Sequence, residues 1–131
     1  MEIFEKYRTE VIEDTQVDEL NVKEVAMKLP AIKHKWVARL ITHKRQLYAL
    51  EKEKERTIEA MLKAIKERGE IQLSKAALAT KLSSQDVIKK LDEKIDNEKS
   101  LVEYLEHVET IFRYMTNDIK NVVEYMKMEL L

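Results

Sequence analysis

The stretch LVEYLEHVETIFRYMTNDIKNVVEYM, residues 101–126, decides the fold class of this chain. Apolar residues recur in it at alternating intervals of four and three, which is the repeat of a helix that packs along one side against other helices. We predict that this seam packs against other helices and is the candidate oligomerisation element of the chain. It consists of Leu101, Leu105, Val108, Phe112, Met115, Ile119, Val122 and Met126.

Further apolar residues, at Val102, Ile111, Val123 and Leu130, widen the seam beyond the narrow stripe of a two-stranded coiled coil. A seam of this breadth indicates either an intramolecular bundle or assembly into more than a dimer, and the sequence leaves both open. The three residues at 116–118, Thr-Asn-Asp, are poor helix formers inside the repeat. They predict a hinge or a break in the helix.

The composition of the whole chain favours helices. Of its 131 residues, 37% are charged and 44% are hydrophobic, and there is one Gly and one Pro. So few turn-forming residues argue against β-hairpins and glycine-rich nucleotide-binding loops. We therefore predict an all-α fold of long amphipathic helices with helical-bundle or coiled-coil-like packing, which is a single structural domain overall.

Two regions are predicted within that domain. Residues 1–82 are an N-terminal helical region with a short first helix, a basic helix at about residues 31–69 and a connector. Residues 83–131 are a C-terminal helical oligomerisation region.

Local signals set the predicted helix ends. Asn21 and Glu24 have the spacing of a capping pair, and Gly69 is a natural helix stop. Pro30 either opens a helix or kinks one that is already running. Ser83 and Asp86 resemble a capping box that begins the last helix.

The connector has two possible structures. Residues 70–73 alternate like a short strand, whereas Ser74 is able to cap a helical turn over residues 76–79.

The net charge of −1 conceals three blocks of opposite sign. Residues 1–30 carry a net charge of −4, residues 31–82 carry +7, and residues 83–131 carry −4. The stretch from Lys33 to Arg45 contains no acidic residue. A concentrated positive segment in a neutral protein is suited to a polyanion.

On an ideal helical wheel, five residues of this block fall within about 40° of one another, nearly opposite the apolar side that runs from Trp36 to Ile65. They are His34, Arg45, Lys52, Arg56 and Lys63. Such a stripe is able to follow phosphates without reading base sequence, although a solvated helix face has the same pattern. The predicted DNA-binding residues are Lys33, Lys35, Arg39, Lys44, Arg45, Lys52, Arg56, Lys63, Lys66 and Arg68.

Catalytic chemistry has little support in the sequence. There is no cysteine, the three histidines lack the spacing of metal ligands, and nucleophile and phosphate-binding motifs are absent. We predict no enzyme, no cofactor and no metal site. No apolar run reaches the roughly 18 residues of a membrane span, and the N-terminus lacks a signal-peptide pattern, so we expect a cytoplasmic protein without a membrane partner.

The run from Trp36 to Gly69 resembles the central segment of the UvsY family of phage recombination mediators, without a gap. The residues that carry the resemblance are Trp36, Arg39, Lys44, Arg45, Leu47, Leu50, Glu51, Lys54, Ala60, Leu62, Arg68 and Gly69. Further similarities extend it over about the last hundred residues, at Leu82, Ser83, Asp92, Leu101, Ile119 and Lys120.

The resemblance implies a non-enzymatic factor of DNA recombination, repair and replication in a bacteriophage, acting in the cytoplasm of the infected bacterial cell. Such proteins form ring-shaped homo-oligomers, which implies about six or seven subunits, and bind single-stranded DNA. They load a RecA-like recombinase onto DNA that is covered by single-strand DNA-binding protein. The resemblance also implies DNA contacts in the segment before the Arg-Gly pair and assembly through the C-terminal region.

Four positions depart from the family pattern. The family has basic residues where this chain has Glu59 and Met61, and tyrosines where it has Ala64 and Ile65. Those contacts cannot be transferred, and our hypothesis is that the basic residues Lys63, Lys66 and Arg68 replace them. The alternative function is a helical scaffold or adaptor that oligomerises through its C-terminal helix and binds protein partners without DNA.

Overall fold

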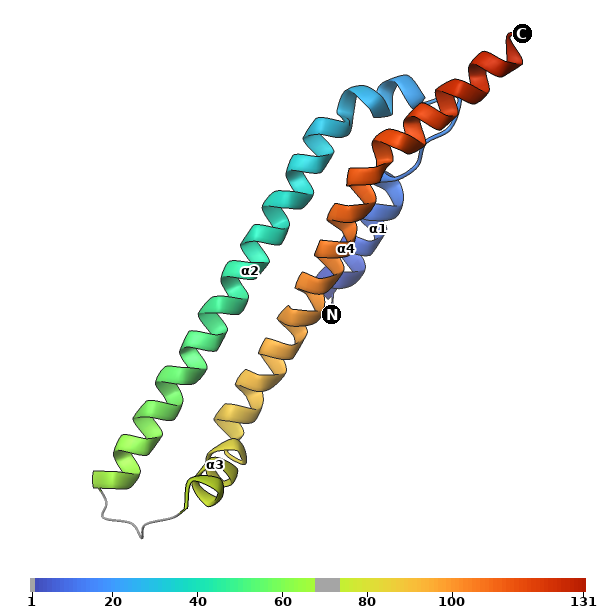
Figure 1. The fold of residues 1–131 in the computed structure, drawn as a ribbon. Helices are drawn as coiled ribbons and strands as arrows, with labels where there is room; N and C mark the ends of the chain where they lie inside the picture. The colour runs from blue at the N-terminus through green and yellow to red at the C-terminus, as the bar shows by residue number, and fades with distance from the viewer. Residues whose placement is uncertain (1, 68–73) are drawn as a thin grey trace. The chain divides into compact units, whose positions relative to one another are not determined.

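The computed structural model describes residues 2–67 and 74–131, and all the elements in this part of the chain are helices (Figure 1). They are α1 (Glu2–Asp14), α2 (Val22–Glu67), α3 (Lys75–Ser83) and α4 (Asp86–Glu129). The predicted all-α fold of long helices is therefore confirmed. The predictions for Arg68, Gly69 and residues 70–73 lie outside the described residues. Among the residues described, no helix combines the length and the apolar character that crossing a membrane requires.

The start of α2 agrees with the sequence in position but not in mechanism. The Val25 amide donates to the Asn21 carbonyl at 2.9 Å, which places Asn21 at the helix end as predicted. Glu24 does not complete a capping box, because its carboxylate pairs with Lys28 one turn later. Pro30 lies inside α2, so it neither opens the helix nor ends it.

The part of the connector that the structure describes contains the helix α3. Ser74 caps α3, since its hydroxyl oxygen accepts a hydrogen bond from the Ala77 amide at 3.2 Å. The capping box predicted at Ser83 is wrong: Ser83 is the last residue of α3, and its hydroxyl donates to the Thr80 carbonyl at 3.0 Å. Gln85 takes the capping position of α4 instead, where its carbonyl accepts from the Lys89 amide at 3.0 Å.

The hinge predicted at residues 116–118 is also wrong, because α4 continues through them to Glu129. The preceding residues Phe112 and Met115 are buried, and Ile119 on the far side is half-buried. Packing on both sides outweighs the weak helix propensity of three residues, since most helical stability in proteins comes from the buried face.

The chain divides into two compact units, and each contains parts of both α2 and α4. The first comprises Met1–Thr42 and Leu101–Leu131. Its core centres on Trp36, whose ring lies 5.6 Å from that of Tyr7 in α1 and 6.2 Å from that of Phe112 in α4. A second aromatic contact, between Phe4 and Tyr104 at 4.9 Å, also joins α1 to α4. This core holds α1 against the other two helices of the unit.

The second unit, His43–Ser100, contains the remainder of α2, all of α3 and the first part of α4. The α2 and α4 segments run antiparallel in it (Figure 1). Polar contacts help to join them: the Lys54 ammonium lies 2.6 Å from Asp92, and buried His43 lies 3.1 Å from Glu98. Its buried apolar side chains are those of Leu82, Ile88, Leu91 and Ile95.

Candidate DNA-binding surface

The predicted DNA-binding residues of the first unit lie on α2, and two of them already have anionic partners. The Lys35 ammonium is 2.6 Å from the Asp14 carboxylate and 3.5 Å from that of Glu10. The Arg39 guanidinium donates to both carboxylate oxygens of Glu10, at 2.6 and 3.4 Å. In this structure, therefore, the first role of Lys35 and Arg39 is to join α2 to α1.

Aromatic rings complete this cluster. The Arg39 guanidinium lies over the rings of Tyr7 and Trp36, 4.7 and 4.8 Å from their centroids. The Trp36 indole N–H donates to the same Asp14 carboxylate oxygen that pairs with Lys35, at 2.9 Å. The hydrogen bond from Arg39 is the main cause that holds the pKa of Glu10 below its ordinary value. Glu10 is thus an anion throughout the neutral pH range.

Lys33 lies on another flank of α2 and faces α4. It is half-buried, and its ammonium donates to the Thr116 hydroxyl at 3.3 Å. This hydrogen bond is exposed and involves no carboxylate, so the positive charge of Lys33 is not neutralised by it.

The predicted stripe on the second unit is more open. Its residues Arg45, Arg56 and Lys63, and Lys66 on its flank, are exposed, and within the described residues none of the four makes an ion pair or a hydrogen bond through its side chain. Their positive charges are therefore accessible to an anion from solution. Lys44 is also exposed, and Arg68 lies outside the described residues.

Lys52 is the stripe residue that has a local partner. Its ammonium lies 3.3 Å from the Glu55 carboxylate and 5.4 Å from the centroid of the Tyr48 ring. The hydrogen bond to Glu55 raises the pKa of Lys52. Tyr48 is 62% exposed, so an aromatic ring is available to solvent directly beside the stripe.

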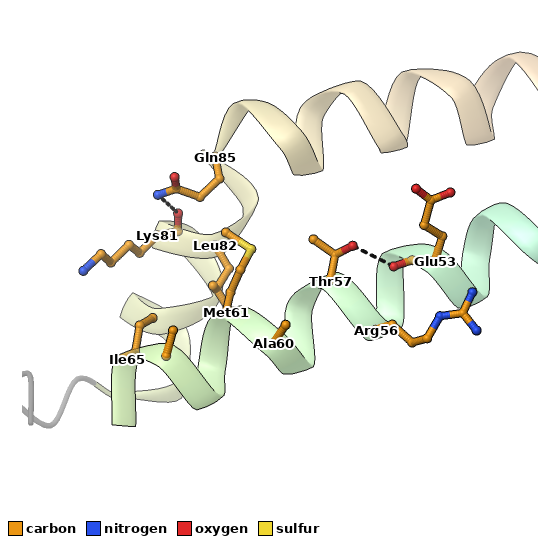
Figure 2. Close-up of a pocket in the computed structure, with 10 residues that line it drawn as sticks. Glu53, Arg56, Thr57, Ala60, Met61, Ile65, Lys81, Leu82 and Gln85 are labelled. Carbon is orange, nitrogen blue, oxygen red and sulfur yellow. Dashed lines mark hydrogen bonds between the residues drawn. The ribbon is translucent and has the colours of Figure 1, made fainter. Parts of the chain in front are cut away.

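A groove of about 570 Å³ adjoins the stripe between α2 and α3 (Figure 2). Arg56 stands at its edge, so the groove and the stripe share this residue. Met61, Ala64 and Ile65, three of the four positions that depart from the family pattern, line the groove. Small and apolar side chains thus occupy the wall where the resemblance implies basic and tyrosine residues.

The predicted oligomerisation seam falls into two parts. Its first five residues have exposed fractions between 0% and 2% in the single chain, so they belong to the core of the first unit. They are Leu101, Leu105, Val108, Phe112 and Met115. The last three, Ile119, Val122 and Met126, are only half-buried. The intramolecular bundle that the sequence left open is therefore real for the first part of the seam.

The sequence reasoning missed the contribution of α1. Glu10 and Asp14 are one helical turn apart, as are Lys35 and Arg39, and this matched spacing was the signal available in the sequence. Without knowledge of which helices pack together, the signal was indistinguishable from other charged pairs. In the described part of the chain, no three His, Asp or Glu side chains gather in an arrangement that could hold a metal ion.

The family comparison covers nearly the whole chain. Residues 10–130 match the family described as "Recombination, repair and ssDNA binding protein UvsY". This chain belongs to the UvsY family. The resemblance seen in the sequence is thus confirmed, and the protein is assigned to phage recombination and repair and to the single-stranded-DNA-binding class.

Solved structures agree in fold. Three crystal structures of the bacteriophage T4 recombination mediator protein UvsY, in lattice types IV, I and II, match with TM-scores of 0.84, 0.81 and 0.82. Their sequence identities to this chain are 18%, 18% and 17%. The matches cover 95%, 93% and 97% of this chain, and 97% of each T4 chain. Among curated proteins, none matches.

Proposed function

We propose that this UvsY-family chain is a recombination mediator. As a homo-oligomer it holds single-stranded DNA and promotes loading of a RecA-like recombinase onto DNA covered by single-strand DNA-binding protein, in the cytoplasm of the infected bacterium. The observation that carries the proposal is a set of exposed cations on α2 that have no partner among the described residues: Arg45, Arg56, Lys63 and Lys66.

These cations suit the backbone of a nucleic acid rather than its bases. Each Lys or Arg that neutralises a phosphate releases condensed counterions, and this favourable term is independent of sequence. Independence of sequence is what a mediator requires, because it must act wherever single-stranded DNA occurs. Tyr48 beside Lys52 adds a ring on which a base is able to stack.

One copy of the stripe is a weak site, so the proposal includes assembly. Four or five cations can contact only a few phosphates. Glu51, Glu55 and Glu59 are exposed on the same helix, and their negative charges reduce the positive potential further. Repetition of the stripe around a closed oligomer multiplies the contacts along one strand. The family resemblance supports a ring of about six or seven subunits.

The end of α4 supplies a surface for this assembly. An apolar groove of about 440 Å³ lies in the first unit. Its lining includes Val22 and Ala26 of α2, Ile119, Val123 and Met126 of α4, and Leu130 directly after α4. Tyr125, Met128 and Leu130 are 64%, 66% and 88% exposed. Covering such apolar area with a second copy is favourable by about 25 cal/mol per Å². Within the predicted seam, Ile119, Val122 and Met126 then make contacts between subunits.

Oligonucleotide binding across a salt series tests the DNA contacts. For single-stranded DNA, the logarithm of the binding constant falls with the logarithm of salt concentration by about 0.7 per phosphate neutralised. The double variant R45E/R56E should make this slope shallower by about 1.4, with an unchanged mass by light scattering. The control K89E/K90E makes the same change in net charge at two exposed lysines of α4 and should keep the wild-type slope.

Two results would contradict the proposal. Undetectable binding to the oligonucleotide at low salt by an assembled protein would favour the scaffold function without DNA. Binding that fails to accelerate recombinase assembly on DNA covered by single-strand DNA-binding protein would leave a DNA-binding protein that is not a mediator. Recombinase ATP hydrolysis on such DNA, with and without this protein, measures the second point.

A further inference from the structure

In the cluster between α1 and α2, two cations form ion pairs with two anions. Glu10 and Asp14 are one turn apart on α1, and they face Lys35 and Arg39, one turn apart on α2. Residues at this spacing have Cβ atoms about 6 Å apart. Successive phosphates of a DNA strand present a similar ladder of negative charges.

The cluster is accessible from solution. The side chains of Lys35 and Arg39 are 35% and 24% exposed, and those of Glu10 and Asp14 are 24% and 19% exposed. The Arg39 guanidinium is held in place by the rings of Tyr7 and Trp36, which do not depend on its carboxylate partner. Arg39 can therefore exchange one anion for another without losing its position.

We propose that Lys35 and Arg39 form an anion-binding pair that the carboxylates of Glu10 and Asp14 occupy in this structure, and that phosphates of single-stranded DNA compete for the pair. This inference rests on the proposed function and adds an internal competitor to it. Helix α1 lowers the affinity of the first unit for DNA, and bound DNA weakens the attachment of α1 by the same factor.

The contacts of α1 with the rest of the first unit oppose its displacement by DNA. Arg39 stabilises the ionised form of Glu10, so the carboxylate is a strong competitor. The aromatic contacts Phe4–Tyr104 and Tyr7–Trp36 hold α1 in place independently of charge. DNA is therefore expected to loosen the end of α1 that carries Glu10 and Asp14 rather than to release the whole helix.

Charge-neutral variants test the competition. The variant E10Q/D14N removes both competing charges. The control E2Q/E13Q removes two exposed α1 carboxylates that have no ion pair among the described residues. Each double variant raises the net charge by two. We expect E10Q/D14N to bind an oligonucleotide several-fold more tightly than E2Q/E13Q. Its salt slope should be steeper by up to about 1.4, because two more phosphates are neutralised. Adding K35Q/R39Q should abolish the gain.

The wild-type chain provides a test that does not depend on the folding of a variant. Amide hydrogen exchange at residues 9–14 should become faster when a saturating oligonucleotide is added, whereas bound DNA ordinarily protects amides. Trp36 is the single tryptophan of the chain and is 1% exposed, so bases do not reach its ring. The fluorescence of Trp36 should nevertheless change when DNA binds. Its indole N–H donates to Asp14, and this hydrogen bond is lost when a phosphate displaces the Asp14 carboxylate.

The outcomes separate the two proposals. Equal affinities of E10Q/D14N and E2Q/E13Q, with unchanged exchange in α1, would overturn the competition while leaving DNA binding intact. Absence of oligonucleotide binding by every variant would overturn both. If circular dichroism shows that E10Q/D14N has lost helix, exchange in the wild-type chain decides the question.

Discussion

Truncation of Leu105 to Ala separates a core role of the seam from a role in assembly. Leu105 is 0% exposed within the first unit of a single chain. Replacement of a fully enclosed Leu by Ala removes transfer free energy and leaves a cavity, at a cost of about 3–5 kcal/mol. Small domains are stable by only about 5–15 kcal/mol, so the loss is large. Met126→Ala, at a half-buried position, should cost about 1 kcal/mol in the unassembled chain.

Urea unfolding followed by circular dichroism measures both variants. With a slope of about 1–3 kcal/mol per molar urea, a loss of about 3–5 kcal/mol in L105A should lower the unfolding midpoint by roughly 1–5 M. This loss should be similar at two protein concentrations a hundredfold apart, because the contacts of Leu105 lie within one chain. If the chain assembles as proposed, M126A should instead raise the concentration at which light scattering detects dissociation, with little change in the unfolding midpoint of the dissociated chain. The reasoning is refuted if L105A abolishes assembly without lowering the urea unfolding midpoint of the dissociated chain.

Two further predictions concern particular contacts. The pKa of Glu10 is lower in the folded chain than its ordinary value, so its ion pair with Arg39 stabilises the fold above about pH 4.5. This contribution is lost as the pH falls through the lowered pKa. Below about pH 4.5, the stability measured by thermal unfolding should therefore fall less steeply in E10Q than in E13Q. Ser74→Ala should destabilise α3 by about 1 kcal/mol, because the Ala77 amide loses its acceptor, and hydrogen exchange within residues 77–83 should become faster while exchange in α1 is unchanged.

Local pattern was sufficient for much of the fold. Residues 31–67 contain no helix-breaking residue, so the helical core of α2 and the stripe on its outer face followed from the 3.6-residue period. The same reasoning failed at Ser83 and at residues 116–118. In both places a local preference competed with neighbouring structure: α3 had already included Ser83, and buried residues around 116–118 kept α4 continuous.

At the candidate site, too, the local pattern located the basic residues, and tertiary packing decided which of them are accessible. The sequence placed Lys35, Arg39, Arg45 and Arg56 in one positive segment and could not distinguish them. The structure does distinguish them, because the first two pair with carboxylates 21 to 29 residues away, while the last two have no partner in the described part of the chain. Whether a cation is accessible depends on the neighbouring helix, which the cation's own helix does not encode.

By itself, the sequence determined that the chain is helical, which faces of its helices are apolar and where positive charge accumulates, since each depends on residues a few positions apart. Only the tertiary structure decided which helix covers each face. It placed Leu105 and Phe112 in the core of a single chain, left the apolar end of α4 exposed, and set Glu10 and Asp14 against Lys35 and Arg39. The physical reason is that burial and ion pairing depend on contacts between residues distant in sequence, and a helical period specifies a face without specifying its partner.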